Sequence, residues 1–323
     1  MKAPEFWYEK DGSLAASLLA PAAAIYDLAS RLTRAGTEPQ TCNAKVICVG
    51  NLVAGGAGKT PVSLALAVLL PEAETAFLTR GYGGREPGPL RVDADTHSSR
   101  DVGDEALLLA RAAPTWVSRN RLNGAGAASK SGARIIIMDD GFQNPSLNKD
   151  ISLVVVDGAT GFGNGRVMPA GPLRETIPHG LARADAVVIV GDDTAGTAAR
   201  IADQAPVFMA RLVPDLVAQP LAGRRVLAFA GIGRPQKFFE TLRDMGCEIV
   251  GTREFADHQP YTPEQIMKIC EDAAALDAAP VTTEKDLVRL PAEARAMVTS
   301  VPVTLQWADP DAIKAFLNTR LSR

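Results

Sequence analysis

Short apolar runs recur along the chain from Lys45 to Gly191, separated by polar segments that can form helices. Each run is rich in β-branched residues and ends in Gly, Asp or Ser; the runs are residues 45–50, 76–81, 115–118, 134–140, 152–157 and 186–191. Continuous apolar runs are typical of parallel strands that are buried on both faces. Helical segments are expected between them, at 61–70, 104–113 and 121–129. The pattern predicts a doubly wound α/β domain with a mostly parallel sheet.

A proline-rich stretch at 213–223 interrupts this alternation, which then restarts. The later pattern predicts strands and helices at 225–233, 236–245 and 262–275, followed by the runs PVTTEKD and VPVTLQW. A length of 323 residues also fits two domains. We therefore expect an N-terminal helical segment (1–34), a larger domain (35–217) and a smaller C-terminal α/β domain (218–323). Two such lobes with a cleft between them indicate an enzyme that closes on its substrate.

The N-terminal segment is apolar but is a poor candidate for a membrane span. Pro21, Asp27 and Arg31 interrupt it, and it lacks the charged start and cleavage site of a secretory signal. Its larger apolar residues have helical spacing: Leu14, Leu18, Ile25, Leu28 and Leu32. Two interpretations remain open: a helix packed on the domain core, or an interfacial helix whose Arg31 and Arg34 face lipid phosphates.

Charge and cysteine usage exclude several classes of protein. The net charge of -3 argues against broad electrostatic binding of nucleic acid, so no nucleic-acid partner is expected. The four cysteines form no C-x-x-C pair and there are only three histidines, which disfavours a structural zinc site. Free thiols fit a reducing cytoplasm.

The segment VGNLVAGGAGKTP (49–61) predicts a phosphate-binding loop with one departure. The usual pattern is G-x-x-x-x-G-K-[ST], and Val53 stands where its first glycine is expected. A buried strand precedes the loop, and Pro61 suits the first turn of a following helix. Lys59 would reach the β- and γ-phosphates and Thr60 would bind Mg²⁺. The predicted nucleotide-binding residues are Val53, Ala54, Gly55, Gly56, Ala57, Gly58, Lys59 and Thr60; a plain strand-to-helix turn is the alternative.

A second signal is the run RIIIMDDGFQ, which ends in Asp139 and Asp140. A carboxylate at a strand tip can hold Mg²⁺ beside the nucleotide. Successive side chains on a strand point to opposite sides, so one aspartate could bind the metal while the other orients water or substrate. An adjacent acidic pair can also form only a turn.

Other polar residues follow predicted strands or begin helices. Asp104 opens a helix in VGDEALLLA, where it could be a cap or the base that takes a proton from an alcohol. RGYGG carries Arg80 and Tyr82, and PAGPLRE presents Arg174 and Glu175 to charged substrate groups or metal. His258 lies in a polar loop, FADHQPY, in the second domain.

These motifs together resemble the tetraacyldisaccharide 4′-kinase family. They occur in the order GN-L-x-x-GG-x-GKTP, RGYGG, GDE, DDGFQ, PAGPLRE, AGIGRPQKFF, F-x-DH and TTEKD, over most of the chain. The family's phosphate loop also departs from the standard first glycine. The resemblance implies a P-loop NTPase-like kinase that transfers the γ-phosphate of ATP, with Mg²⁺, to the 4′-hydroxyl of a tetraacylated glucosamine disaccharide 1-phosphate, giving lipid IVA in lipid A biosynthesis.

The resemblance also implies roles for individual residues. Asp104 would be the catalytic base paired with His258, with Lys59 on the nucleotide. The implied metal positions are Thr60, Asp139, Asp140 and Glu175, and the implied substrate positions are Arg80, Tyr82, Arg119, Arg121, Gln143 and Arg174. Gln259 is a departure, because many relatives carry a second histidine there, which weakens any role for a histidine pair.

A substrate with four acyl chains leaves a bilayer only at a cost of about 0.8 kcal/mol for each methylene. This favours the interfacial interpretation of the N-terminal helix. The resemblance therefore implies a peripheral enzyme on the cytoplasmic face of the bacterial inner membrane, expected to act as a monomer. The competing hypothesis is a P-loop switch or chaperone ATPase that acts through a protein partner. TTEKD only superficially resembles the N-K-x-D of guanine-specific switches.

Overall fold

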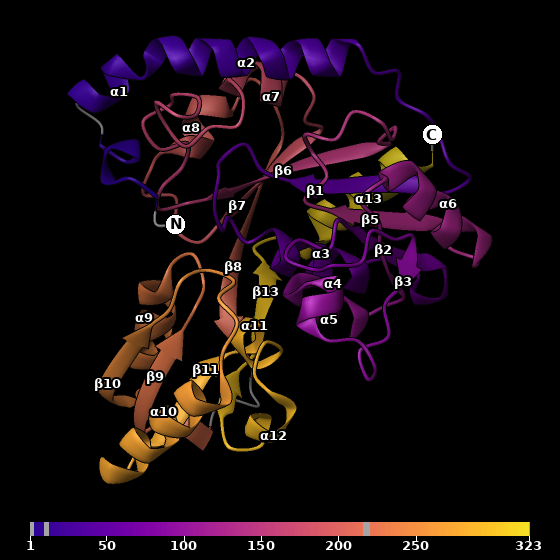
Figure 1. Ribbon diagram of the computed structural model, residues 1–323. Coiled ribbons are helices and arrows are strands. Elements are labelled where there is room, and N and C mark those ends of the chain that lie inside the picture. The colour runs from indigo at the N-terminus through magenta and orange to yellow at the C-terminus, as the bar shows by residue number, and fades with distance from the viewer. Residues whose placement is uncertain (1–2, 10–12, 216–219, 323) are drawn as a thin grey trace.

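The computed structural model describes residues 3–9, 13–215 and 220–322 (Figure 1). Within them the chain forms a nine-stranded and a four-stranded sheet, here called the larger and the smaller lobe with their helices. Only the two edge strands of the larger sheet, β13 and β3, pair antiparallel with their neighbours. In spatial order its strands are β13 (Val303–Trp307), β8 (Val207–Pro214), β7 (Ala186–Val190), β6 (Ile151–Asp157), β1 (Lys45–Gly50), β5 (Ile135–Asp139), β2 (Thr75–Thr79), β4 (Thr115–Val117) and β3 (Leu90–Arg91).

Helices cover both faces of the larger sheet, as continuous apolar strands require. One face packs on α3 (Lys59–Val68), α5 (Asp104–Ala110) and α13 (Pro310–Leu321). The other packs on α6 (Arg121–Lys130), α7 (Ile177–Leu181) and α8 (Thr197–Ile201), and α2 (Ala20–Ala35) adds Ala23 to that cluster. The remaining short elements of this lobe are η1 (Glu5–Trp7), α1 (Leu14–Leu18), η2 (Glu72–Glu74) and α4 (Ser99–Val102).

The smaller lobe repeats the layered plan on a smaller scale. Its parallel strands, in order, are β10 (Glu248–Glu254), β9 (Arg225–Ala230), β11 (Ala279–Thr283) and β12 (Thr299–Val301). Phe238 and Phe239 of α9 (Pro235–Asp244) pack on one face, and α10 (Pro263–Ala275) packs on the other. The short helices α11 (Glu284–Leu287) and α12 (Ala292–Arg295) follow β11.

The expected α/β architecture with a mostly parallel sheet is confirmed, but the end of the chain differs from its expected position. The run VPVTLQW was assigned to the smaller domain, and 218–323 was expected to be one unit. Instead β13 pairs antiparallel with β8 of the larger sheet, and Ile313 of α13 lies in the core of the larger lobe. An apolar run identifies a strand but not its partner, because pairing depends on contacts distant in sequence. The expected boundary at 217/218 lies outside the described residues.

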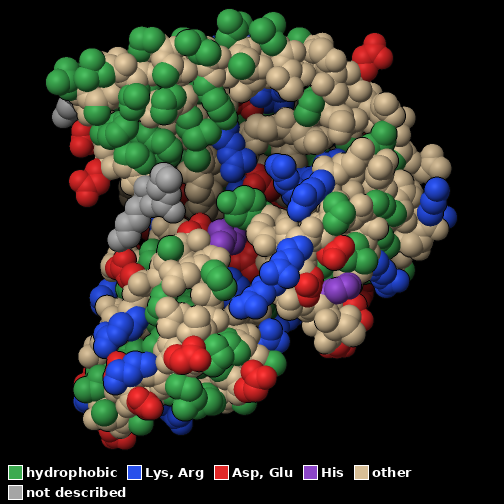
Figure 2. Space-filling model, viewed as in Figure 1, with side chains coloured by type: hydrophobic (Ala, Val, Ile, Leu, Met, Phe, Trp, Pro, Cys, Tyr) green, Lys and Arg blue, Asp and Glu red, His purple; other side chains and the backbone are tan. Residues whose placement is uncertain are grey.

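The N-terminal segment forms α1 and α2, which lie across the top of the molecule in Figure 1. The residues on its inner face are small or polar: Ala16, Ala23 and Asp27 are buried. Its outer face carries the five large apolar residues, Leu14, Leu18, Ile25, Leu28 and Leu32, which are 57–77% exposed. Figure 2 shows hydrophobic side chains gathered over this part of the surface. Among the described residues, no helix is both long and apolar enough to cross a membrane.

Candidate active site

The predicted phosphate loop joins the carboxyl end of β1 to the first turn of α3, which begins at Lys59. Gly58 adopts φ 89°, a left-handed conformation that favours glycine and turns the chain into the helix. A Cβ placed on Gly55 or Gly56 would meet no atom within 4 Å, so this part of the loop faces open space. Backbone N–H groups at such a loop and helix N-terminus suit phosphate binding.

The structure gives a physical reason for valine at the loop's entrance. Val53 forms an antiparallel bridge with Leu173, and the Ala54 N–H donates to the Pro172 carbonyl at 2.8 Å. The Arg174 N–H donates in turn to the Leu52 carbonyl at 2.7 Å. An extended, paired residue has no need of glycine. The bridge also brings the PAGPLRE segment beside the phosphate loop, two motifs that are far apart in sequence.

Asp139 ends β5, which pairs directly with β1, as expected for a carboxylate beside the phosphate loop. Its buried carboxylate accepts from Thr60 Oγ1 at 3.1 Å and from Ser63 Oγ at 2.8 Å. Burial, together with the charge of Glu105, raises the pKa of Asp139 to about 7. Mg²⁺ in nucleotide sites is usually held by one or two carboxylates, phosphates and water. A hydroxyl and a carboxylate in contact therefore fit this ion.

Asp140 turns to the other side of the strand end, with φ 52°. Its Oδ1 lies 3.1 Å from Arg174 Nη1 and 3.7 Å from Lys59 Nζ. Burial raises its pKa, but the charges of Lys59 and Arg174 outweigh burial and lower the pKa overall. The two aspartates thus have different surroundings: one faces hydroxyls and the other faces cations.

Glu175 lies among arginines and not with the two aspartates. Its Oε2 is 2.5 Å from Arg183 Nη2 and 3.5 Å from Arg34 Nη2 of α2, and its carboxylate is fully buried. Gln143 Nε2 lies 3.4 Å from its Oε1, while Gln143 Oε1 accepts from Arg174. Among the described residues, no three His, Cys, Asp or Glu side chains group as a metal site. The geometry gives the predicted metal role of Glu175 no support.

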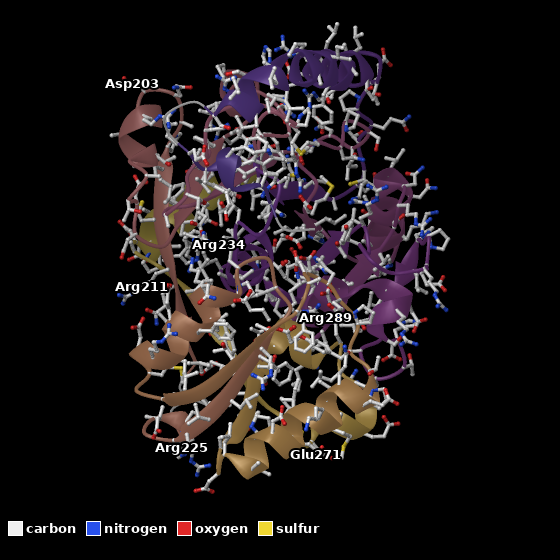
Figure 3. All side chains as sticks on the ribbon, turned by 60° about the vertical axis from the view of Figure 1, so that its left-hand side comes forward. Asp203, Arg211, Arg225, Arg234, Glu271 and Arg289 are labelled. Carbon is white, nitrogen blue, oxygen red and sulfur yellow. The ribbon has the colours of Figure 1, made fainter. Side chains whose placement is uncertain are left out.

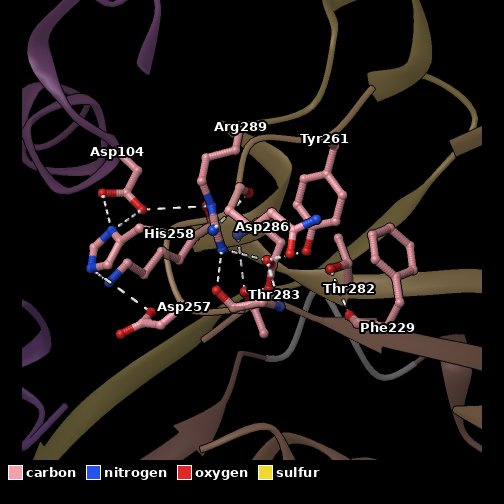
Figure 4. A network of polar contacts seen from close by, with 12 residues as sticks. Asp104, Phe229, Asp257, His258, Tyr261, Thr282, Thr283, Asp286 and Arg289 are labelled. Carbon is pink, nitrogen blue, oxygen red and sulfur yellow. Dashed lines mark hydrogen bonds and ion pairs between the residues drawn. The ribbon is translucent and has the colours of Figure 1, made fainter. Parts of the chain in front are cut away.

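Asp104 and His258 meet between the lobes, although 154 residues separate them. His258 Nδ1 lies 2.9 Å from Asp104 Oδ2 and 3.1 Å from Oδ1, and His258 adopts φ 58° (Figure 4). Asp104 Oδ1 also accepts from the Glu105 N–H, but Asp104 is the first residue of α5 and Gly103 is the N-cap, so the pairing and not the capping interpretation matches the structure. Burial raises the pKa of Asp104, but the hydrogen bond from His258 and nearby cations lower it overall. Asp104 is therefore an ionised acceptor at neutral pH.

Charged residues of the smaller lobe surround this pair. Arg289 Nε lies 3.5 Å from Asp104 Oδ2, and Arg289 Nη2 lies 2.5 Å from Asp286 Oδ1. Lys285 Nζ lies 3.1 Å from Glu105 Oε1 and 3.3 Å from His258 Nε2. Sequence reasoning recognised TTEKD but assigned no residue of it. The feature that could have pointed to these residues is the position of TTEKD at the end of a predicted strand, where functional residues often lie.

The predicted substrate residues lie in different surroundings. Tyr82 is exposed and its ring lies 5.2 Å from that of His258. Arg80 is exposed, and Arg119 is an exposed residue that donates to the Arg85 carbonyl. Arg121 is buried; its Nη1 donates to the Ser118 carbonyl, and its Nε has no partner among the described residues. Burial and the charge of Arg80 lower the pKa of Arg121 to about 10.

A second contact between the lobes was not predicted. Asp157, at the end of β6, lies 2.8 Å from Arg234 Nη1 and 3.4 Å from Lys237 Nζ. Arg234 and Arg289 both lie where the smaller lobe meets the larger one (Figure 3). A Cβ placed on Gly233 would lie 3.7 Å from the Gly56 nitrogen, so this turn of the smaller lobe approaches the phosphate loop. Figure 2 shows Lys, Arg, Asp and Glu side chains in the hollow between the lobes.

Comparison with known proteins gives one consistent family. The model of the LpxK family, tetraacyldisaccharide-1-P 4′-kinase, matches residues 15–322. The tetraacyldisaccharide 4′-kinases of Rhodospirillum centenum and Rhodospirillum rubrum are 54% and 51% identical, covering 100% and 98% of this chain and 97% of each relative. The crystal structure of LpxK from Aquifex aeolicus in complex with ATP has a similar fold, with a TM-score of 0.75 at 24% identity over 95% of this chain and 100% of that one. The chain belongs to the tetraacyldisaccharide-1-P 4′-kinase family.

Proposed function

We propose that the chain transfers the γ-phosphate of ATP to the 4′-hydroxyl of a tetraacylated glucosamine disaccharide 1-phosphate, forming lipid IVA. Family membership supports this reaction, since relatives named tetraacyldisaccharide 4′-kinase match the whole chain. The observation that carries it is the 2.9 Å contact between Asp104 and His258, because it forms a base and its orienting partner between the two lobes. A switch or chaperone ATPase has no need of such a pair.

The phosphate loop, residues 53–60, would bind the triphosphate of ATP through its backbone N–H groups, with Lys59 on the β- and γ-phosphates. Thr60 and Asp139 would hold Mg²⁺, which when bound neutralises charge on the transferring phosphoryl group. Asp140 forms ion pairs with Lys59 and Arg174, so it would orient the side chains of these two cations. Glu175 would anchor Arg183 and Arg34 in place of binding metal.

The acceptor is activated by Asp104 in this proposal. The 4′-hydroxyl proton passes to the Asp104 carboxylate while its oxygen forms a bond to the γ-phosphorus and the bond to the ADP oxygen breaks. His258 orients Asp104 through its Nδ1 contact. Arg80, Tyr82, Arg119, Arg121, Gln143 and Arg174 are the proposed contacts to the phosphorylated sugar. One copy of the chain supplies both Asp104 and His258, so neither residue of the pair has to come from a second copy.

The helices α1 and α2 would rest on the cytoplasmic face of the inner membrane. Their outward row of leucines and isoleucine supports this, because burial of such side chains in the acyl boundary drives interfacial binding. Arg34 extends from the same helix to Glu175, so the surface that would meet lipid is connected to the site. A tetraacylated substrate could then be phosphorylated without leaving the bilayer.

The double substitution Leu18→Glu with Leu28→Glu is expected to reduce binding to vesicles containing anionic phospholipid by at least about tenfold. Burying one leucine side chain contributes about 1.5–3 kcal/mol, and each glutamate also meets negative lipid. Flotation of vesicles measures the bound fraction. Val68→Glu is the matched control, because Val68 is as exposed but lies on α3. Equal binding by all variants would return α1 and α2 to a purely structural role.

The reaction itself is tested by incubating the pure protein with ATP, Mg²⁺ and the tetraacyldisaccharide 1-phosphate in detergent. We expect a product that carries a second phosphate, detected by mass spectrometry, and one ADP for each product. ATP hydrolysis with no phosphorylated lipid would favour the switch or chaperone ATPase instead.

A further inference from the structure

Lys285 touches the Asp104–His258 pair but has no role in the reaction proposed above. Its Nζ lies 3.3 Å from His258 Nε2, on the opposite side of the ring from Asp104. An ammonium group has three donors and no acceptor. The imidazole nitrogen that faces it must therefore carry a lone pair. The single ring proton then lies on Nδ1, where it can be donated to Asp104.

A doubly protonated His258 is disfavoured by the same contact. Its second proton would lie on Nε2 and point at the ammonium, bringing two cations together. An imidazolium would also form an ion pair with Asp104 and make that carboxylate a weaker base. A cation beside Nε2 disfavours the doubly protonated ring and makes no contact with the oxygens of Asp104.

We propose that Lys285 is a positioning residue that holds His258 in the neutral Nδ1–H tautomer and so preserves the basicity of Asp104. The proposal rests on the function proposed above, in which Asp104 takes the proton of the acceptor hydroxyl. Among the described residues, Lys285 Nζ lies within hydrogen-bond distance of Glu105 and His258, and not of the nucleotide loop or Asp104. Its proposed positioning effect on Asp104 is exerted through His258.

The charge of Lys285 is secured by the other lobe. Burial lowers its pKa, but the carboxylates of Glu105, Asp104 and Asp257 outweigh burial and raise the pKa overall. Glu105 lies on α5 of the larger lobe, 3.1 Å from Nζ, whereas Lys285 lies on α11 of the smaller lobe. Glu105 of the larger lobe thus helps to keep the ammonium charged. The contact at Nε2 itself lies within the smaller lobe, because His258 and Lys285 both belong to it.

Other charged and aromatic groups also face the His258 ring. Asp257 Oδ1 lies 3.8 Å from Nε2 and favours a charged ring, but Lys285 is closer. Arg289, buried beside Asp286, places a second cation near Asp104, and the uncharged Tyr82 ring covers His258 at 5.2 Å. Two cations therefore oppose protonation of His258 while Asp104 and Asp257 favour it. At Nε2 itself, the nearer charge is the ammonium of Lys285.

The tautomer can be observed directly, without substrate. The chain has three histidines, so ¹⁵N-labelled histidine gives few signals, and His258→Ala identifies those of His258. At neutral pH we expect a protonated Nδ1 and an unprotonated Nε2 in the wild-type protein. In Lys285→Met we expect His258 to bind its second proton at a pH higher by about one unit or more, because a charge within about 4–6 Å shifts a pKa by roughly 1–3 units. A protonated Nε2 in the wild-type protein would overturn the proposal.

Kinetics supply a second readout. Lys285→Met is expected to move the acidic limb of kcat/KM to higher pH by a similar amount, and Lys285→Arg, which restores the cation, to bring it back. The sign follows from charge repulsion at His258: without the neighbouring cation the doubly protonated ring is opposed less, so the active neutral ring forms only at higher pH. A purely structural role for Lys285 would lower activity by one factor at every pH, and that result would overturn the proposal.

Two controls separate the effects of closure and of His258. Glu105→Gln weakens the contact between the lobes but leaves the ammonium near Nε2, so we expect no movement of the acidic limb to higher pH. In a His258→Ala background, Lys285→Met should move the limb much less than in the wild-type background, because only the direct effect of the ammonium charge on Asp104 remains. A shift of undiminished size without His258 would contradict the proposal. If the tautomer is observed but no phosphorylated lipid forms, the proposed function fails and the assignment of Lys285's contact stands.

Discussion

Asp104→Asn is expected to lower kcat by about 10²–10⁴-fold, the contribution typical of general base catalysis. The amide has nearly the shape of the carboxylate but cannot take the proton of the acceptor hydroxyl. The affinity for ATP should change little, because among the described residues the Asp104 carboxylate contacts His258, Arg289 and the Glu105 N–H, and not the phosphate loop. A base acts chiefly in the transition state, so kcat and not nucleotide binding should carry the loss.

Measurement requires both quantities on the same preparation: kcat from the rate of lipid phosphorylation, and the ATP dissociation constant by calorimetry. Asp101→Asn is the matched control, since Asp101 lies just before Asp104 in the capping box of α4 and its carboxylate accepts from Ser98. It should leave kcat close to the wild-type value. A large loss of ATP affinity with kcat preserved in Asp104→Asn would assign Asp104 to nucleotide binding.

The second large effect is expected at Lys59. Lys59→Ala should reduce kcat/KM by about 10²–10³-fold, as expected when one preorganised group that stabilises the transition state is removed. The side chain begins α3 beside the open glycines of the phosphate loop and is nearly buried, so its charge is only weakly screened. Its removal also leaves the negative charge of Asp140 paired with Arg174 but not with Lys59, close to where the γ-phosphate would bind.

A lysine at the other end of the same strand provides the comparison. Lys45 begins β1 and pairs with Asp150, at the sheet edge opposite to the phosphate loop. Lys45→Ala should keep kcat/KM near the wild-type value, measured with the same lipid substrate over a range of ATP concentrations. If both alanine variants lost activity equally, the loss at position 59 would reflect stability and not the contact with phosphate.

Residues within one strand, loop and helix were predictable from the sequence. Lys59, Thr60 and Asp139 come together because a buried parallel strand ends at a loop, the loop opens a helix, and a neighbouring strand ends in a carboxylate. In such a strand–loop–helix unit, the local geometry of the chain determines where these side chains lie. Asp104 and His258 came instead from the resemblance to a family, since each alone had an ordinary structural explanation. Their contact was confirmed by the structure.

Contacts that depend on how distant segments pack were not predictable. Glu175 ends a motif that could present a carboxylate to metal, yet Arg34 and Arg183 reach it from α2 and from beyond α7. Lys285 and Glu105 lie 180 residues apart, and nothing in TTEKD indicates which carboxylate it meets. The apolar run at 301–307 predicted a strand correctly but not its sheet. Pairing partners are selected by tertiary packing, and a local pattern does not contain that choice.

The return of β13 to the larger sheet has a consequence for synthesis on the ribosome. β8 emerges before the whole smaller lobe, and its antiparallel partner β13 emerges only after it. Domains generally fold as units while the chain is made. The smaller lobe can therefore finish folding while β8 still presents an open strand edge to other nascent chains. We expect chaperone demand to be highest in that interval and to end when β13 and α13 leave the exit tunnel.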